Sequence, residues 1–283
     1  MASFTNFATL SYNGGTTNSN IVTGEILEAL TAVKTAVSAN YSAGDRITYA
    51  LSLVNTGTAA ITDYTVTDNL GGYTVGANTV YPLAYNAGTV RYYINGVLQA
   101  VPTVTAGPPL TVTGLTVPAG GSAVLIYETT ATPVAPLATG SSITNTATIT
   151  GGGLTTPITA QATVETANSA DLTISKALSP TTVTENGQIT YTFVISNTGN
   201  TEATATGNVV VTDTFAPILR NIAVTYNGTA WTEGTNYTYN AATGVFTTLA
   251  GQITVPAATF TQNTDGTFTV TPGTATLVIT GTV

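Results

Sequence analysis

The sequence contains no cysteine and no histidine, and charged residues make up only 6% of its 283 residues. Without cysteine there are no disulfides and no thiol nucleophiles, and without histidine the usual zinc sites and imidazole acid–base catalysis are excluded. We therefore expect no metal site, no cofactor and no enzymatic activity beyond an autocatalytic reaction of the chain with itself. Any covalent reinforcement has to use other side chains.

Basic residues are also scarce. Five lysines and arginines stand against thirteen acidic residues, which gives a net charge of −8. A chain of this charge has no electrostatic footprint for nucleic acid or for an anionic membrane surface. The first thirty residues hold no basic segment followed by an apolar run, so neither a secretory signal nor a membrane-spanning segment is predicted. Nucleic acid and membrane insertion are therefore not expected.

What the chain does contain is a series of short strand patterns separated by turn residues. Alternating runs such as Arg46 to Val54 and Tyr64 to Asp68 are accompanied by turn signals such as Asn55-Thr56-Gly57 and Asn95-Gly96. Many short strands at regular spacing predict an all-β sandwich.

The strand pattern occurs twice. The spacing from Lys176 to Ile189 equals that from Lys34 to Ile47, and the strands that follow also recur in order. Self-similarity at this period indicates two tandem immunoglobulin-like domains. We predict an N-terminal strand and flexible linker over residues 1–24, a complete sandwich over 25–152, a linker over 153–170 and a second sandwich over 171–283.

One segment of the first repeat has its match at the N-terminus and not in the second repeat. Residues 142–150 (SITNTATIT) resemble residues 3–11 (SFTNFATLS), whereas the second repeat ends without such a segment. A sandwich that lacks a strand exposes an apolar groove, and an extended segment can add to an open sheet edge. We predict that each subunit lends its N-terminal strand to the second domain of a neighbour. The predicted groove contacts are Phe4, Ala8, Leu10 and Tyr12.

The chain has only two lysines, Lys34 and Lys176, and they hold equivalent positions in the two repeats. Strand alternation places Lys176 on an otherwise apolar face, and it turns Asp68, Asp213 and Asn145 toward the core as well. Buried polar and charged groups need partners. Lysine, acid and amide are therefore expected to meet inside the sandwiches.

Two arrangements satisfy these groups, and the remaining alternative is that the residues face solvent and are unrelated to one another. In the first, lysine and aspartate form a buried salt bridge to which the asparagine is hydrogen-bonded. In the second, the lysine amine attacks the asparagine carboxamide, ammonia leaves, and an isopeptide bond joins two strands with the help of the aspartate. An apolar pocket favours this reaction because it lowers the pKa of an amine and raises that of a carboxyl group. Close contact supplies the high effective concentration that a poor electrophile requires.

The first repeat contains both partners of such a bond, Lys34 and Asn145. The second repeat has no asparagine at that place, so Asn6 of the next subunit is the predicted partner of Lys176. The predicted catalytic acids are Asp68 and Asp213. Glu128 or Glu185 could serve as the acid in one repeat, but neither has an acidic counterpart in the other.

Several motifs carry a family resemblance: DLTISK at 171–176, SNTG at 196–199, VTDT at 211–214 and ITNTAT at 143–148. With these motifs, residues 31–150 and 171–283 resemble the bacterial and archaeal cell-surface repeat catalogued as domain of unknown function eleven. The resemblance implies an immunoglobulin-like sandwich in an extracellular, stalk-like or fibrous protein. The lysine, acid and asparagine set is also similar to that of Gram-positive pilins and adhesins with internal isopeptide bonds.

The predicted function is that of a structural subunit of an extracellular filament whose partner is a further copy of itself. A cell-surface or spore-surface appendage is expected, the latter being compatible with the lack of a visible leader. The alternative is an adhesin fragment in which loops around Tyr92-Tyr93 and Trp231 bind a glycan or a host protein. Asp265-Gly266 lacks the ligand spacing of a calcium loop and is expected to form a hairpin turn.

Overall fold

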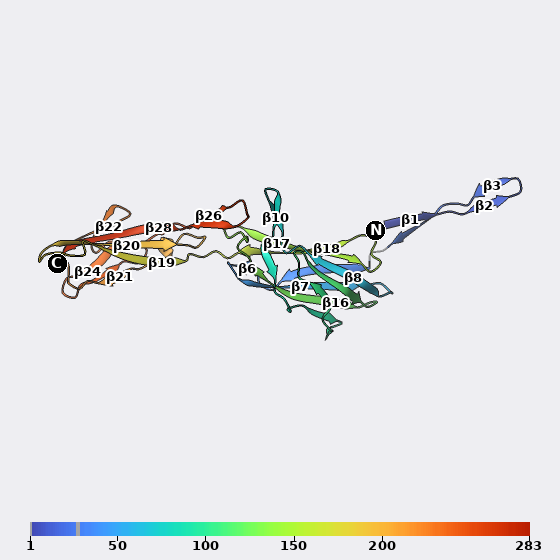
Figure 1. Cartoon of the computed structure of the whole chain (residues 1–283), viewed down its shortest axis with the longest axis horizontal. Helices are drawn as coiled ribbons and strands as arrows, with labels where there is room; N and C mark the ends of the chain where they lie inside the picture. Colours follow the sequence, from blue (N-terminus) through green and yellow to red (C-terminus); the bar gives the residue numbers. More distant parts are fainter. Residues whose placement is uncertain (1, 27–28) are drawn as a thin grey trace. The chain divides into compact units, whose positions relative to one another are not determined.

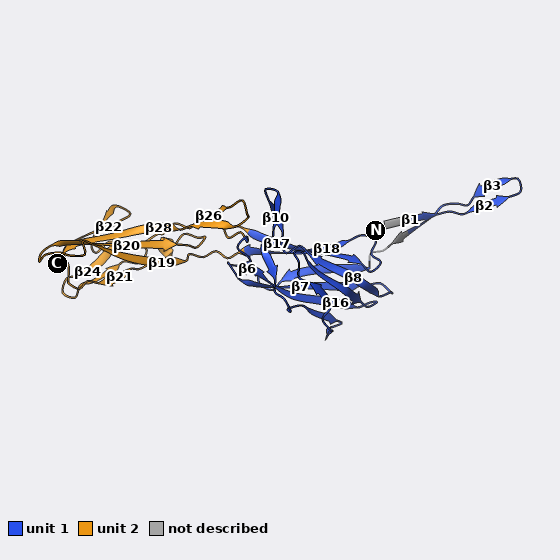
Figure 2. Cartoon of the chain, viewed as in Figure 1, with its two compact units in different colours: residues 1–135, 142–165 blue, residues 136–141, 166–283 orange. Residues whose placement is uncertain are grey.

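The computed structural model describes residues 2–26 and 29–283. Its fold is all-β, as predicted: within these ranges every regular element is a strand apart from one 3-10 turn, Ala205–Gly207. The chain divides into two compact units, residues 1–135 with 142–165 and residues 136–141 with 166–283 (Figure 2). Within the described ranges no helix is long and apolar enough to cross a membrane.

The first unit contains two six-stranded sheets (Figure 1). The hydrogen-bonded order of one sheet is β13 (Val97–Leu98), β12 (Arg91–Ile94), β16 (Ser122–Ala131), β7 (Arg46–Asn55) and β5 (Leu30–Ala36), with β11 (Leu83–Tyr85) also paired to β16. The order of the other is β14 (Thr103–Thr105), β15 (Leu110–Val117), β8 (Ile61–Asp68), β17 (Ser142–Gly151), β18 (Ile158–Thr166) and β6 (Asn40–Tyr41). A small hairpin, β9 (Tyr73–Val75) with β10 (Asn78–Val80), stands outside both sheets.

The core of the first unit lies between these sheets. Along β7, Ile47, Tyr49, Leu51 and Leu53 are fully buried and alternate with more exposed residues. Such alternation is typical of an antiparallel sheet with one covered face. The strand orders β12-β16-β7-β5 and β15-β8-β17-β18 correspond to the two sheets of an immunoglobulin-like sandwich.

The second unit repeats the first sheet and only part of the second. Its five-stranded sheet has the order β19 (Leu172–Ser179), β20 (Gln188–Asn197), β28 (Gly273–Thr282), β22 (Arg220–Tyr226) and β23 (Thr229–Trp231). The opposing sheet has the order β21 (Thr212–Thr214), β25 (Val245–Thr248) and β24 (Tyr237–Asn240). A hairpin of β26 (Thr259–Gln262) and β27 (Phe268–Thr271) is separate.

The Asn-Thr-Gly turn is built in the same way in both units. The side-chain amide of Asn55 donates to two backbone carbonyl groups at 2.8 and 3.0 Å, and that of Asn197 does so at 2.7 and 3.0 Å. Their side-chain oxygens accept from the backbone N–H groups of Gly57 and Gly199 at 3.0 and 2.9 Å. These equivalent contacts show which residues of the two repeats correspond in sequence.

Residues 2–26 form a hairpin. β1 (Ala2–Asn6) pairs with β4 (Val22–Ile26), and β2 (Thr9–Tyr12) pairs with β3 (Gly15–Asn18). The predicted flexible linker after the first strand is therefore wrong, because the Gly/Asn/Thr-rich segment returns along that strand. Its threonine and asparagine side chains bond across the hairpin, as Thr9 does to Asn18 at 2.8 Å.

The predicted linker over residues 153–170 is wrong in its middle, where Ile158–Thr166 forms β18. This strand pairs with β17 along its length, and it buries Ala160, Ala162 and Val164. Apolar and polar residues alternate from Ile158 to Glu165, a strand signal that the linker prediction overlooked although two of the apolar residues are alanines. Burial of the strand in the first unit determines its conformation.

Both hairpin turns expected from the sequence are present. Asn95 and Gly96 connect β12 with β13 at φ values of 47° and 79°, the left-handed conformations that a two-residue turn requires. Asp265 and Gly266 lie between β26 and β27, where the Asp265 carboxylate accepts from the Thr267 backbone N–H at 3.0 Å. Across the described residues, no group of three or more acidic side chains is placed to hold a metal ion.

Candidate cross-linking sites

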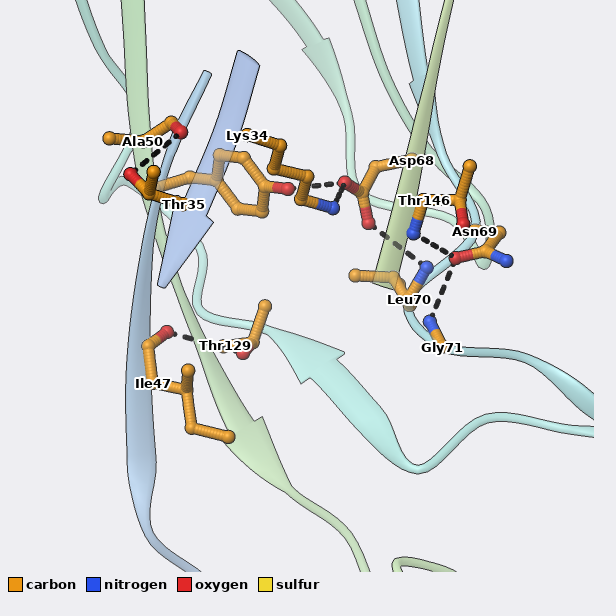
Figure 3. Close-up of polar contacts among 11 residues, drawn as sticks. Lys34, Thr35, Ile47, Ala50, Asp68, Asn69, Leu70, Gly71, Thr129 and Thr146 are labelled. Carbon is orange, nitrogen blue, oxygen red and sulfur yellow. Dashed lines mark hydrogen bonds and ion pairs between the residues drawn. The ribbon is translucent and has the colours of Figure 1, made fainter. Parts of the chain in front are cut away.

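The lysine and the aspartate of the first unit meet in its core. Lys34 projects from β5 in one sheet and Asp68 from the end of β8 in the other (Figure 3). The Lys34 Nζ lies 2.5 Å from Asp68 Oδ2, and the two side chains are 0% and 1% exposed. The second carboxylate oxygen accepts from the backbone N–H of Leu70 at 3.0 Å. The ion pair therefore links the two sheets.

Two tyrosines complete the surroundings of this pair. The Tyr127 hydroxyl donates to the same Asp68 oxygen that binds Lys34. The Lys34 Nζ lies 4.8 Å from the ring centroid of Tyr49 and 5.8 Å from that of Tyr127. These rings stack on each other because their residues are cross-strand partners on β7 and β16. Sequence reasoning missed both tyrosines, since only the strand register brings them together.

Asn145 is fully buried, and neither atom of its amide makes a hydrogen bond. Burial raises the pKa of the Tyr49 and Tyr127 hydroxyls, the Asp68 charge raises it further, and the nearby Asn145 amide lowers it. The Asn145 amide thus lies near the Tyr49 and Tyr127 hydroxyls but makes no hydrogen bond with either. Each buried, unpaired polar group costs about 1–3 kcal/mol. The predicted hydrogen bond from Asn145 to the ion pair is absent.

The strand that carries Asn145 is held on both edges. The backbone N–H of Thr146 donates to the Asn69 side-chain oxygen at 2.9 Å (Figure 3). The Asn69 N–H donates to the Thr146 carbonyl at 2.9 Å. On the other edge Asn145 lies opposite Ala162 of β18. Because Asn69 directly follows Asp68, the acid and the amide are positioned by one short piece of backbone.

The environment of Lys34 favours its neutral form. Burial lowers the pKa of Lys34 from 10.5 to about 8, although the charge and the hydrogen bond of Asp68 oppose this shift. About a tenth of the amine is then neutral at pH 7. A neutral amine is the nucleophilic form. Moving its proton to Asp68 replaces two buried charges by two neutral groups.

The second unit holds the same pair in an uncovered form. The Lys176 Nζ lies 2.5 Å from Asp213 Oδ2, but the two side chains are 40% and 19% exposed. The Tyr191 ring centroid is 4.5 Å from the ammonium nitrogen. In the first unit Tyr127 lies opposite Tyr49. At the equivalent place in the second unit Ile279 lies opposite Tyr191. The Tyr127 hydroxyl thus has no equivalent on this strand.

The exposure of the second pair follows from the composition of its sheet. In the first unit β8 lies between β15 and β17. In the described part of residues 166–283, the corresponding strand β21 pairs with β25 alone, and β17 and β18 have no counterparts. Apolar residues beside the lysine on β19 are open to solvent: Ile174 is 55% exposed and Leu178 39%.

The remaining predicted residues lie on the hairpin of residues 2–26. Phe4, Leu10 and Tyr12 are 53%, 64% and 62% exposed, and Asn6 and Ala8 are exposed as well. A row of exposed apolar side chains is available for contact with another molecule. Their contact with a second copy stays a prediction.

The two alternative acids lie away from the lysines. Glu128 pairs with Arg46 at 3.6 Å on the surface, and Glu185 is exposed. Asp68 and Asp213 are the carboxylates that bind Lys34 and Lys176.

The aromatic residues predicted as a binding surface are parts of strands. Tyr92 on β12 is 5% exposed, and its hydroxyl donates to the Thr116 carbonyl. Trp231 on β23 stacks against Tyr226 with ring centroids 4.8 Å apart. The expectation that they lie in loops is therefore wrong, because they lie on strands. Binding of a glycan or a host protein by these residues stays a prediction.

No protein-family model and no curated protein sequence matches the chain. Among solved structures, it is similar to the N-terminal domain of the Streptococcus gordonii adhesin Sgo0707, at 14% identity and a TM-score of 0.35, over 47% of this chain and 31% of that one. It is similar to BcpA, the major pilin subunit of Bacillus cereus, at 14% and 0.36, over 96% and 73%. The pilus backbone RrgB from Streptococcus pneumoniae matches at 14% and 0.36, over 86% and 55%. The chain thus spans about a third of the first protein and about half of the last, and the repeat family named above remains a resemblance.

Proposed function

We propose that this protein is the structural subunit of an extracellular filament in which the N-terminal segment of one copy completes the second unit of the next. The observation that carries the proposal is the open edge of β21 beside the exposed pair of Lys176 and Asp213. In the first unit β17 occupies the equivalent edge of β8. The β17 sequence at 142–150 is identical to residues 3–11 at five of nine positions.

The register of β17 specifies how the donated segment lies. β17 pairs with β8 so that Ala147 is opposite Asp68. The same register on β21 puts Ala8 opposite Asp213. Asn6, two residues before this alanine, then projects from the core face of the strand beside the lysine of the second unit. Main-chain hydrogen bonds provide affinity in this mode of recognition, and alternate side chains provide specificity.

The filament is locked by isopeptide bonds, one within each chain and one between neighbours. In the first unit the neutral Lys34 amine attacks the Asn145 side-chain carbonyl carbon, which is polarised by the proton that Asp68 has taken up. The bond from that carbon to the amide nitrogen breaks, and the nitrogen leaves as ammonia with the proton returned through Asp68. The new amide removes a buried ammonium and an unpaired carboxamide together. Burial of Lys34, Asp68 and Asn145 in one core supports a high effective concentration of the amine at the amide.

A position on the outer surface of a cell or spore fits this design. The surface carries few charges, and the strength comes from amide bonds in a chain without cysteine. Such bonds do not depend on the redox state of the compartment in which the filament is assembled, whereas disulfides do.

A chain lacking residues 1–12 is expected to remain monomeric where the full chain forms filaments, because its acceptor edge has no donor. Light scattering and electron microscopy of the two chains at equal concentration measure the difference. A separate peptide of residues 1–26 should bind the truncated chain and block its use as an acceptor. Filaments formed by the truncated chain alone would contradict the proposal.

The bond in the first unit also changes how stability depends on pH. In an Asn145→Ala chain Lys34 stays a free amine, with a pKa lowered from 10.5 in the unfolded chain to about 8 in the folded one. The folded state then binds fewer protons than the unfolded state between these values, so stability rises with pH. We expect an increase of about 2 kcal/mol from pH 8 to pH 10.

The wild-type chain, with its amine in an amide bond, is expected to lack this increase. Buried tyrosines, whose pKa values are raised, are common to both chains and cancel in the comparison. Urea unfolding at pH 8 and pH 10 measures both chains. The same pH dependence in both would show a free Lys34 amine in the wild type and oppose the bond.

A further inference from the structure

The hairpin of residues 2–26 copies two strands of the first unit and not one. β1 pairs with β4 in the register that β17 adopts with β18, so that in both pairs a serine position is opposite a glutamate position and a threonine position is opposite a threonine position. The pairs are Ser3–Glu25 and Thr5–Thr23 in the hairpin, and Ser142–Glu165 and Thr144–Thr163 in the first unit. Residues 22–25 read VTGE where residues 162–165 read ATVE.

In each of the two strand pairs, the side chains that lie opposite each other on the core face fit each other in size. In the first unit Ile143 lies opposite Val164, and both are buried. In the N-terminal hairpin Phe4 lies opposite Gly24, and a Cβ at Gly24 would come within 2.4 Å of the Phe4 ring. The pair of Phe4 and Gly24 thus replaces the pair of Ile143 and Val164, with one large side chain and none in place of two of medium size. The glycine is required on β4 because β1 carries the larger residue.

The acceptor has room for both strands. The described part of the second unit has a counterpart neither of β17 nor of β18. In the first unit β18 buries Ala160, Ala162 and Val164, so a single donated strand would leave that portion of the second core uncovered. A donor that enters as a hairpin also keeps its own strand pairing, whereas a single strand would first have to separate from β4.

We infer that β1 and β4 enter the second unit of a neighbouring copy together, with β1 on the edge of β21 and β4 outside it. This inference rests on the proposed function and adds a second strand to the interface. Val22, which lies opposite Asn6 as Ala162 lies opposite Asn145, packs on the core of the acceptor.

A disulfide across the hairpin distinguishes the two modes of entry. Thr5 and Thr23 are exposed, and their counterparts in the first unit are exposed with hydroxyl oxygens 2.8 Å apart. Directly opposed strand residues are within reach of a disulfide, and the chain has no other cysteine. The Thr5→Cys/Thr23→Cys chain is expected to assemble at the same rate oxidised or reduced.

Assembly of this variant only after reduction would mean that a single strand enters, which overturns the hairpin donor and leaves strand donation standing. A wild-type chain that does not assemble overturns the filament and this inference together.

A second pair of variants tests the face of β4 without a disulfide. Val22 is 55% exposed in the free chain, so Val22→Asp leaves its fold intact. In the filament the new carboxylate would be buried without a partner, and we expect assembly to slow by roughly tenfold or more. Thr23→Asp, one residue along on the opposite face, is expected to assemble as the wild type does. Wild-type assembly by Val22→Asp would overturn the inference.

Discussion

Replacing Asn145 by alanine is expected to abolish the loss of one ammonia from the chain and to lower the free energy of unfolding of the first unit by about 4–5 kcal/mol. A bond between residues 34 and 145 closes a loop of 111 residues (145 − 34 = 111). The chain-entropy treatment of cross-links gives the stabilisation above for a loop of that size. The amide itself makes no hydrogen bond, so its removal costs little else.

This loss corresponds to a fall in Tm of about 10–20 °C for a unit of this size. Scanning calorimetry and intact mass, measured on the same samples, give both quantities. Asn86→Ala is the matched control, since Asn86 has a buried, unpaired amide nitrogen in the same unit and accepts one hydrogen bond from Thr130 at 2.9 Å. It should cost about 1 kcal/mol and keep the ammonia loss. A wild-type chain of unmodified mass would leave only the buried salt bridge between Lys34 and Asp68.

The meeting of Lys34 with Asp68 could be predicted because several local rules agree. Strand alternation decides the face of each residue, and a chain with two lysines at equivalent positions has few ways to compensate a buried ammonium. The all-β fold and the hairpin at Asn95 and Gly96 follow from equally local signals. These rules do not predict the exposure of the pair of Lys176 and Asp213, since that exposure depends on which strands cover the pair.

What the sequence did not reveal depends on long-range pairing. In the sequence, nothing distinguishes Tyr127 from other strand residues. Its hydroxyl reaches Asp68 only because β16 pairs with β7. The strand over Ile158–Thr166 does show apolar–polar alternation, but two of its four core-facing residues before Thr166 are alanines, and only its pairing with β17 shows that it belongs to the first unit. Residues 13–20 of the N-terminal hairpin are rich in glycine and asparagine, which indicates a loop unless the pairing of the strands around them is known.

Replacing Asn6 by alanine is expected to leave filaments that form normally but separate into monomers when boiled in detergent. The proposed groove contacts of Phe4 and Leu10, and the proposed main-chain bonds to β21, do not involve the amide, so strand donation should survive. The wild-type filament should instead give a ladder of covalent multimers, because under the proposal the amide of each copy is joined to Lys176 of the next. A denaturing gel with intact mass on boiled samples measures the difference.

The masses separate the two bonds. In the wild type each subunit should lose one ammonia for its internal bond, and each link between two neighbours should release one more, whereas monomers of the Asn6→Ala chain should lose only the first. Asn20→Ala is the matched control: Asn20 is an exposed asparagine of the same N-terminal segment, and its removal should leave the ladder unchanged. An unchanged ladder in the Asn6→Ala chain would place the link at another residue. Wild-type filaments that collapse to monomers, each lighter by one ammonia, would keep the bond between Lys34 and Asn145 and make the contact between subunits non-covalent. That outcome would fit the difference between the two sites, since the second lacks the hydroxyl that Tyr127 gives to Asp68.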